Sequence, residues 1–541
     1  MADDTTLNIL YGSRTGNARA AADLARDYAR HLGLAAELHD TRSVEIDEFL
    51  TWKNVLIAVS THGEGDPPAA VEMFYHDLHD TNGHSMKGTR FGVLALGDSS
   101  YSDFCKTGND IRTRLLELGA DETVPLVECD IDFEENARQW VRRSVETFRE
   151  LLPREREAGD KPFAFELKTG DSDFENAFFA PVLEKRLLTE PDAEKRTIHL
   201  SLDLEGFPDS YLPGDSFGIY LHNPRFLVDR LLRSARYDPS HPVETRNGLK
   251  MLKEALLAEY ELTVLTPVVV RAYAELTGDP RLVEIIAAED RLDDYCRNRD
   301  VVDLVESFPP PEDPEDLLST LRKLAPRLFS AASIYDPVDP RVDLTISLVE
   351  YPVDDRLHRG VCSTYIADRV EEGDTVPVFL DPNESFRLPR DDNAPVVMVA
   401  TGTGIAPFRA FLQERERRGA SGDNWLFFGD RREASDYLYR RDLERHLESG
   451  LLTRVDTAFS RDSEEKVYVQ HRLEAAGREV YRWLSERGAY IYLCGNKRSM
   501  GKDVKDTLEN ILARQGGLSR ERAAEFLQEL RSQKRYQMDL Y

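Results

Sequence analysis

The stretch 396–411 constrains the fold of this chain more than any other. Its first five residues, Val-Val-Met-Val-Ala, form an apolar run of the length expected for a buried parallel strand. Thr401-Gly402-Thr403-Gly404 follows, and then a sequence typical of a helix. A strand, glycine turn and helix start together present backbone N–H groups and a positive dipole end, which suit a pyrophosphate. Pro407 stands where a third glycine is usual. Because a lone Gly-x-Gly turn is also found in plain strand–helix connections, the rest of the chain has to decide.

Length and composition exclude several classes of protein. A chain of 541 residues, 41% hydrophobic, is expected to hold two to four domains. No apolar run approaches 18 residues and the start, Met1-Ala2-Asp3-Asp4, is too polar for a signal peptide, so we expect a cytoplasmic protein without a membrane span. The five cysteines show no CxxC spacing, which argues against a metal or iron–sulfur site and fits a reducing compartment: Cys105, Cys129, Cys296, Cys362 and Cys494.

The negative charge is concentrated at the N-terminus. Residues 1–150 hold 15 Lys and Arg against 27 Asp and Glu, so this part carries −12 of the net −29. Such a balance disfavours nucleic acid and anionic membranes as partners. Two interpretations of the excess stay open: a solvated surface, such as a salt-adapted protein has, or a docking face for a basic partner.

Three strand–loop units in the N-terminal domain predict one ligand site. The strands Leu7–Tyr11, Val55–Val59 and Phe91–Leu96 are each followed by a loop rich in glycine and hydroxyl residues. In an open α/β sheet such loops meet at the carboxyl edge, where ligands bind. The first loop, with a helix behind it, suits a phosphate monoester. Tyr101 in the third loop is either a surface aromatic or a side chain that stacks on a planar ring.

The middle of the chain changes in character twice. A charged stretch at 153–162 is expected to be a linker. Strands are then predicted at 180–188, 195–202 and 216–220, with a turn at 211–215. Residues 224–326 are predicted to be almost wholly helical, with helices at 226–237, 248–259 and 266–276, and to serve as a spacer and packing domain. A helical insert that interrupts an antiparallel barrel explains this order.

Beyond the insert, two further anion sites are predicted. Arg327 can neutralise a phosphate, Phe329 can cover a ring and Ser330 can hydrogen-bond a ring nitrogen, although each is also an ordinary barrel residue. Gly360 to Thr364 opens a helix and repeats the logic of a pyrophosphate site. The segment 378–389 is expected to close the barrel.

The C-terminal α/β domain contains residues suited to a phosphorylated ribose. The strand Thr453–Phe459 ends at Ser460-Arg461, and Lys466 follows. A hydroxyl and two cations at a strand end suit a ribose 2′-phosphate, where NAD sites use a carboxylate; without further support they are ordinary surface residues. Cys494, at the end of the strand Tyr490–Leu493, is either a small core residue or a neighbour of a nicotinamide ring.

The residues of the N-terminal domain, about 5–150, resemble the flavodoxin family. The resemblance implies that the first loop binds the FMN phosphate and that the other two enclose the isoalloxazine ring. The residues to which it assigns FMN binding are Ser13, Arg14, Thr15, Gly16, Asn17, Ala18, Ser60, Thr61, His62, Gly63, Leu96, Gly97, Asp98, Ser99, Ser100, Tyr101, Ser102, Asp103, Phe104 and Cys105.

Residues 327–330 resemble the Arg-x-Tyr-Ser signature of ferredoxin–NADP reductase-like flavin domains. Phe329 replaces the usual tyrosine, which keeps stacking but loses a hydroxyl. The resemblance implies FAD binding by Arg327, Leu328, Phe329, Ser330, Thr345, Tyr351, Gly360, Val361, Cys362, Ser363 and Tyr541. It implies NADPH binding by Gly402, Thr403, Gly404, Ser460, Arg461, Lys466, Tyr468, Gln470 and Asp503, and it places Ser330, Cys494, Asp539 and Tyr541 at the site of hydride transfer.

The whole chain resembles the diflavin reductases. It is most similar to the flavoprotein components of NADPH-dependent assimilatory sulfite reductase, on the evidence of the third FMN loop, of 383–389, of 466–470 and of the C-terminal 535–541. The expected fold is multidomain: a flavodoxin-like FMN domain at 1–152, a linker at 153–162, an antiparallel FAD-binding β-barrel at 163–223 and 327–390, a helical connecting domain at 224–326 and an α/β NADP domain at 391–541.

The resemblance also implies an activity and a partner. Electrons would pass from NADPH to FAD, to FMN and on to the sulfite reductase haemoprotein (beta) subunit, which carries sirohaem and an iron–sulfur cluster, as in cysteine biosynthesis. Two alternatives stay open: a reductase for another haem or iron–sulfur acceptor, and a non-catalytic flavin-binding scaffold. Because the first strand starts at Leu7, without the N-terminal extension linked to oligomer assembly in enterobacterial-type components, a large alpha-subunit oligomer is doubtful and a monomer is expected.

Overall fold

The computed structural model describes residues 5–540 except 14–15, 63–64, 82, 102, 155–162, 168–175, 246, 354–355 and 497–499. The chain divides into two compact units, each built from two separate stretches. One comprises residues 1–172 and 225–325, and the other 173–224 and 326–541. Among the described residues, no helix is both long and apolar enough to cross a membrane.

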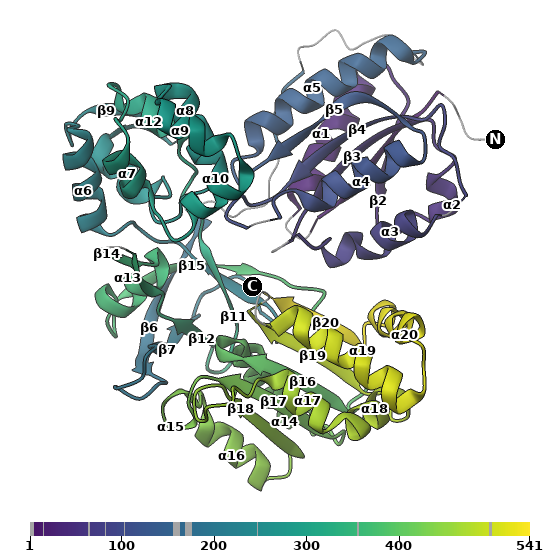
Figure 1. The fold of residues 1–541 in the computed structure, drawn as a ribbon, viewed down its shortest axis with the longest axis vertical. Helices are drawn as coiled ribbons and strands as arrows, with labels where there is room; N and C mark the ends of the chain where they lie inside the picture. The colour runs from purple at the N-terminus through teal and green to yellow at the C-terminus, as the bar shows by residue number, and fades with distance from the viewer. Residues whose placement is uncertain are drawn as a thin grey trace. The chain divides into compact units, whose positions relative to one another are not determined.

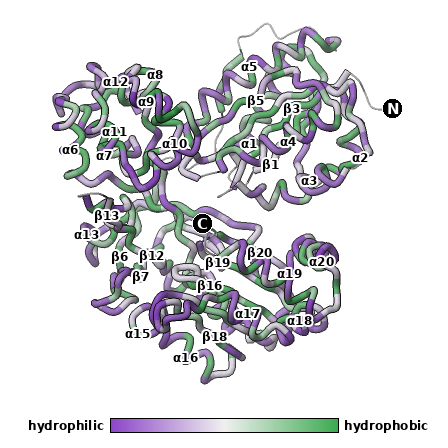
Figure 2. The backbone as a smooth tube through the Cα atoms, viewed as in Figure 1, coloured by the Kyte–Doolittle hydropathy of each residue, from purple (hydrophilic) through white to green (hydrophobic). Residues whose placement is uncertain are grey.

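The first unit contains a five-stranded parallel sheet in the order β2-β1-β3-β4-β5 (Figure 1). Helices α1 and α5 pack on one face, and α2, α3 and α4 on the other. The strands are apolar along most of their length, as Figure 2 shows for β3, because both faces are covered. The elements are β1 (Leu7–Gly12), α1 (Asn17–His31), β2 (Ala36–Asp40), α2 (Ile46–Phe49), β3 (Asn54–Ser60), α3 (Ala69–Asp80), β4 (Arg90–Leu96), α4 (Lys106–Glu117), β5 (Asp121–Cys129) and α5 (Glu134–Leu151).

The same unit contains the segment that was predicted to be helical. It has one large core of its own, formed by its helices and by Val243 of a small hairpin. The hairpin corrects the sequence analysis: residues 248–251, predicted as the start of a helix, pair with 242–245 because Gly248, at φ 89°, ends the turn between them. The elements are α6 (Arg225–Ala235), β9 (Pro242–Thr245), β10 (Gly248–Met251), α7 (Leu252–Ala258), α8 (Pro267–Thr277), α9 (Pro280–Ile286), α10 (Glu289–Cys296), α11 (Val301–Ser307) and α12 (Pro314–Thr320).

The second unit begins with an antiparallel sheet in the order β11-β8-β15-β6-β7-β12. A bridge between Ala331 and Leu344 joins its two ends, so the sheet closes into the expected barrel. Helix α13 follows a short hairpin and opens at Gly360. The elements are β6 (Phe178–Leu187), β7 (Thr197–Asp203), β8 (Ser216–Ile219), β11 (Arg327–Ser330), β12 (Arg341–Ser347), β13 (Glu350–Val353), β14 (Arg356–Arg359), α13 (Val361–Arg369) and β15 (Thr375–Asp381).

The C-terminal part of this unit is a parallel sheet in the order β18-β17-β16-β19-β20. The organising strand predicted at 396–400 is β16, at its centre, and it is wholly buried up to Ala400. Helices α14 and α16 cover one face and α17 to α20 the other. The elements are β16 (Val396–Thr401), η2 (Gly402–Ile405), α14 (Ala406–Arg418), β17 (Asn424–Asp430), α15 (Glu433–Asp436), α16 (Arg440–Glu448), β18 (Arg454–Phe459), α17 (Val469–Ala475), α18 (Gly477–Ser485), β19 (Tyr490–Gly495), α19 (Lys502–Gly516), α20 (Arg520–Ser532) and β20 (Tyr536–Leu540).

Candidate functional site: flavin and nucleotide edges

The carboxyl ends of β1, β3 and β4 are neighbours in the first sheet, so the three predicted flavin loops meet at one edge. At the first loop, Gly16 has φ 83° and precedes α1, whose start has no side-chain cap and no acidic residue in its first turn. The Ser13 hydroxyl accepts a hydrogen bond from the Gly16 N–H at 3.0 Å. An uncapped helix start of this kind fits a phosphate group.

The second and third loops are tied to each other. The Thr61 N–H donates to the Leu96 carbonyl at 2.8 Å, and the Thr107 N–H donates to the Thr61 hydroxyl at 3.1 Å. Cys105 is fully buried and its thiol donates to the Ala95 carbonyl at 3.3 Å, so this side chain supports the loop from the core. Four residues predicted at this site, Arg14, Thr15, Gly63 and Ser102, lie outside the described residues.

Two residues of the third flavin loop are also in contact with the helical segment of the same unit. Arg322, whose side chain is only 6% exposed, forms ion pairs with Asp98 and with Asp130, the latter at 2.9 Å. The Ser99 hydroxyl lies 3.2 Å from the Thr266 hydroxyl. Lys323 adds an ion pair with Glu134 at 3.0 Å. The carboxylates at this edge are therefore neutralised by cations from another segment of the chain.

Electrostatics at this contact favours the ionised carboxylate. Burial opposes ionisation of Asp98, but attraction by Arg322 and hydrogen bonds from Ser100 and Arg322 outweigh it, and the pKa of Asp98 is lowered. Because breaking a buried pair leaves an uncompensated charge, Arg322 is important for how the flavodoxin-like sheet is held to the helical segment.

In the barrel, the predicted flavin residues lie on β11 and at the start of α13. Helix α13 begins at Gly360 with no side-chain cap and no acidic residue in its first turn. A Cβ at Gly360 would lie 2.9 Å from the Val349 Cβ, so the turn depends on glycine. The Ser363 hydroxyl accepts a hydrogen bond from the Val349 N–H at 3.0 Å. A helix start whose backbone N–H groups remain available fits the pyrophosphate of a dinucleotide.

The remaining predicted FAD residues differ in what their side chains contact. The Tyr351 ring stacks on His358 with an interplanar angle of 8°. The Cys362 side chain is buried, and burial raises the pKa of this thiol to about 12. The Thr345 hydroxyl lies in the core, 2.8 Å from the hydroxyl of Tyr439.

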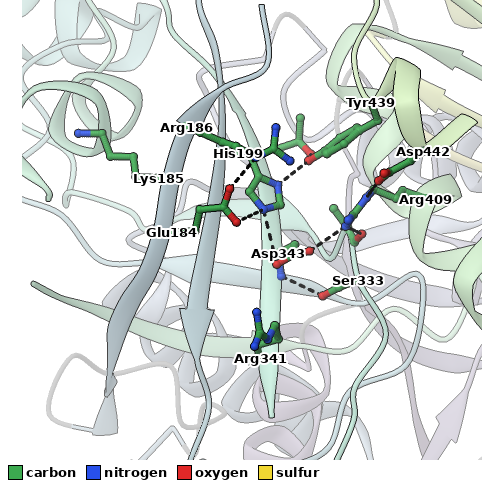
Figure 3. A network of polar contacts seen from close by, with 12 residues as sticks. Glu184, Lys185, Arg186, His199, Ser333, Arg341, Asp343, Arg409, Tyr439 and Asp442 are labelled. Atoms are coloured by element: carbon green, nitrogen blue, oxygen red, sulfur yellow. Dashed lines mark hydrogen bonds and ion pairs between the residues drawn. The ribbon is translucent and has the colours of Figure 1, made fainter. Parts of the chain in front are cut away.

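Tyr439 belongs to a buried polar network that joins the barrel to the C-terminal sheet within the second unit (Figure 3). Its hydroxyl lies 3.1 Å from His199 Nδ1, and burial raises the pKa of Tyr439 to about 12. Arg409 lies over the Tyr439 ring and pairs with Asp343 and Asp442, each at 2.7 Å. The Asp343 N–H donates to Ser333 at 2.9 Å. The network links β7 and β12 of the barrel to the helices α14 and α16.

The glycine turn after β16 adopts the geometry that the sequence predicted for a pyrophosphate site. Gly402 has φ 56°, and a Cβ at Gly404 would lie 2.1 Å from the carbonyl oxygen of Cys494. Lys195, from the β6–β7 loop, lies above this turn: its Nζ is 3.3 Å from the position of a Gly402 Cβ and 2.9 Å from both carboxylate oxygens of Asp430. A close backbone approach beside a cation fits a diphosphate group.

Of the predicted 2′-phosphate residues, Ser460 and Arg461 directly follow β18, and Lys466 lies in the loop before α17. The Ser460 N–H donates to the Asp430 carbonyl at 3.0 Å, and the Arg461 N–H donates to the Arg431 carbonyl at 2.8 Å. Arg461 forms an ion pair with Glu194. Gln470 donates to Asp503 at 3.0 Å, which brings two more predicted nucleotide residues together. Within the part of the chain that the structure describes, no hydrogen bond or ion pair joins these residues to Lys466 or to the half-exposed Tyr468 side chain.

The residues predicted for hydride transfer converge where β11 meets the C-terminal strands. The Ser330 hydroxyl donates to Asp539 at 3.2 Å. Asp539 is the register partner of Cys494 across β19 and β20. Burial, and then the charge of Asp539, raise the pKa of the Cys494 thiol well above its usual value. The thiol is therefore neutral at physiological pH. Tyr541, predicted to cover the flavin, lies outside the described residues.

Comparison with known proteins identifies three domain families along the chain and relatives that match nearly all of it. Family models match the chain as Flavodoxin over residues 9–140, FAD binding domain over 171–289 and Oxidoreductase NAD-binding domain over 398–506. The sulfite reductase (NADPH) flavoprotein alpha-component of Bacillus subtilis (strain 168) is 41% identical over 542 residues, which cover 99% of this chain and 89% of the relative. Those of Aliivibrio fischeri (strain ATCC 700601 / ES114) and Vibrio vulnificus (strain CMCP6) are both 38% identical, again over 99% of this chain and over 89% and 87% of the relatives.

The chain belongs to the sulfite reductase flavoprotein alpha-component family. It is an NADPH-dependent oxidoreductase with sites for FMN, FAD and NADPH, as the resemblance implied. The expected fold class is likewise confirmed. The helix starts at Gly16 and Gly360 and the glycine turn at Gly402 are the parts of this family member that fit the phosphate groups of the three molecules.

Sequence reasoning missed four charged residues at the nucleotide edge of this family member: Glu194, Lys195, Arg431 and Arg432. The first two lie in a loop between barrel strands, more than two hundred residues away in sequence from the residues with which they pair. No local pattern indicates such a contact. Arg431 and Arg432 directly follow β17, and their position at a carboxyl strand end was a usable signal.

Proposed function

We propose that this chain takes hydride from NADPH at the second unit and delivers electrons, through FAD and then FMN, to a sulfite reductase haemoprotein in the cytoplasm. When bound, FAD supplies the chemistry that converts a two-electron donor into single-electron transfers, and FMN passes these on. The protein's own residues bind, orient and shield the reacting groups. The names of the relatives support sulfite reduction as the destination of the electrons.

The observation that carries the proposal is the convergence of Ser330, Asp539 and Cys494 beside the glycine turn. A hydroxyl held by a carboxylate can orient a polar ring atom, and a neutral thiol fills the space beside the nicotinamide without adding negative charge there. Close placement of donor and acceptor accounts for a large part of the rate of such transfers. A flavin-binding scaffold without activity has no need of this set.

The flavin edge of the first unit supports a basic partner. Asp98, Asp130 and Glu134 lie on or beside its loops and are paired with Arg322 and Lys323. Because these carboxylates are already neutralised, an acceptor with a basic face would be attracted by the wider excess of negative charge in residues 1–150, which sums to −12 within that stretch, and complementary charge would speed the encounter. The same argument holds for another haem or iron–sulfur acceptor, which is the second candidate function.

The deciding experiment measures sulfite-dependent NADPH oxidation and sulfide formation by the full chain loaded with both flavins. It is run with and without a sulfite reductase haemoprotein subunit. We expect sulfide only when both proteins are present. Reduction of dyes without sulfide would reject the sulfite reductase partner and favour another acceptor, and failure to reduce any dye with NADPH would reject the electron-transfer function.

A further inference from the structure

Three arginines at the nucleotide edge share one carboxylate from the barrel. Arg461 forms an ion pair with Glu194, and Arg431 and Arg432 approach the same carboxylate at 3.8 and 3.6 Å. The Arg432 guanidinium also donates to the Arg461 carbonyl at 2.9 Å, which fixes two of the three relative to each other. With Glu194 included, this cluster of four side chains carries a net charge of about +2.

Glu194 therefore occupies the place where the ribose 2′-phosphate is expected. Ser460 and Arg461, predicted to bind that phosphate, are held by backbone hydrogen bonds to Asp430 and Arg431. A phosphate monoester carries a charge of about −1.5 to −2 at neutral pH and suits an arginine cluster. A carboxylate that pairs with the same guanidinium groups is a competitor for them.

The ion pair of Glu194 differs in burial from that of the adjacent residue, Lys195. Lys195 pairs with Asp430, and their side chains are only 16% and 3% exposed. The side chains of Glu194 and Arg461 are 46% and 41% exposed. Exposed ion pairs contribute little to stability and are readily exchanged for others. The β6–β7 loop thus provides one buried tie, through Lys195, and one exchangeable pair, through Glu194.

We infer that Glu194 is a specificity-determining residue: it acts as a resident competitor that only a ligand with a 2′-phosphate displaces from Arg461, Arg431 and Arg432. The inference rests on the proposed use of NADPH. With Glu194 present, the cluster should bind a 2′-phosphate more weakly than the three arginines alone would. NADH, which lacks the phosphate, leaves the pair intact.

The test measures binding of 2′,5′-ADP to the flavin-loaded full chain by calorimetry, without turnover. Glu194→Gln is expected to tighten binding about two- to fivefold at low salt, because the exposed ion pair no longer has to be broken. The gain should shrink as ionic strength rises. Binding of 5′-ADP, which has no 2′-phosphate, should change less than twofold. Unchanged or weaker binding of 2′,5′-ADP by this variant would overturn the inference.

A matched control lies in the same loop. Glu190 is exposed, and its N–H donates to the Ser435 carbonyl. Glu190→Gln removes the same charge and should bind 2′,5′-ADP like the unmodified protein; an equal gain would show that net charge alone, and not the Glu194 pair, sets affinity.

Arg461→Gln separates this inference from the proposed function. If Arg461→Gln weakens 2′,5′-ADP binding while Glu194→Gln does not strengthen it, the nucleotide site stands and the competitor is rejected. If Arg461→Gln has no effect, the assignment of the 2′-phosphate site fails, and the competitor fails with it.

Discussion

The flavin edge of the first sheet and the nucleotide edge of the last one are built alike but present opposite charges. Both are carboxyl edges of five-stranded parallel sheets. In the first, the domain's first strand lies between β2 and β3; in the last, β16 lies between β17 and β19. Each arrangement has a point where successive connections leave in opposite directions, and a glycine loop lies there. The sheet decides where a ligand binds, and the loops decide which one.

The difference between the two edges lies in the countercharge each receives from another segment. Carboxylates at the flavin edge pair with the almost completely buried Arg322, whereas arginines at the nucleotide edge pair with the half-exposed Glu194. A buried pair is costly to break and an exposed one is not. The comparison therefore predicts a stable contact at the first edge and a readily exchanged one at the second.

The largest expected effect is the loss of the buried cation. Arg322→Gln leaves Asp98 and Asp130 without their main partner, and we expect it to lower the free energy of unfolding of the first unit by about 3–5 kcal/mol. The measurement is urea denaturation followed by fluorescence. Lys323→Gln is the control: Lys323 is 37% exposed, and its loss should cost no more than about 1 kcal/mol. Equal effects of the two variants would contradict the contrast between the edges.

The same contact predicts a pH dependence. Because the pKa of Asp98 is lowered from 3.8, its stabilising contribution is complete above pH 3.8 and is lost as the pH falls through the lower value in the folded protein. The free energy of unfolding of the unmodified protein should therefore fall in acid as Asp98 is protonated, and this fall should be smaller in Arg322→Gln. If Arg322→Gln lost as much stability in acid as the unmodified protein, Arg322 would not be the cause of the lowered pKa of Asp98.

At the nucleotide edge, the expected effect is on rate and not on stability. Cys494→Ala removes a buried side chain next to Asp539 and beside the glycine turn, and we expect flavin reduction by NADPH to slow about 10²-fold through misplacement of the reacting groups. Stopped-flow absorbance of the flavins measures this. Cys296→Ala, in the core of the helical segment, should leave that rate unchanged. A folded Cys494→Ala protein with the original rate would remove Cys494 from the site.

The two edges also show what sequence could and could not predict. Glycine turns, buried strands and the residues that follow them are local, so the flavin loops and the turn at 402–404 were predictable. The contacts of Arg322 with Asp98, and of Glu194 with Arg461, join residues 224 and 267 positions apart. No periodicity or spacing encodes such pairs. The hairpin at 242–251 was missed for a different reason, since the alternation of Leu249 and Met251 is too short to separate from a helix start.

Each of the two edges depends on a glycine, for a different reason. A Cβ at Gly404 would collide with the backbone of β19, so Gly404→Ala should cost about 1–3 kcal/mol and weaken NADP⁺ binding. Gly16 has open space around it but φ 83°, so Gly16→Ala should cost about 1–2 kcal/mol from conformation alone. Thermal denaturation and ligand titrations measure both. Normal NADP⁺ binding by a stable Gly404→Ala protein would contradict the close approach.

The smallest expected effect concerns the buried polar network around Tyr439 in the second unit, which corresponds to the Arg322 contact in the first. Burial lowers the pKa of His199 below 6.5, despite the opposing charge of Asp343. The neutral ring therefore stabilises the fold fully above pH 6.5, and this stability is lost as the pH falls from 6.5 toward the pKa in the folded protein. The slope from one such group is at most about 1.4 kcal/mol per pH unit. Urea denaturation between pH 5 and 8 measures how the free energy of unfolding changes with pH, and this change should be smaller for His199→Gln than for the unmodified protein. His39, His222 and His446, whose pKa values are also lowered, contribute to the change in both proteins. An identical pH dependence in the two proteins would mean that protonation of the His199 ring does not destabilise the folded protein. The network would then be stabilised by Arg409 and its two carboxylates alone.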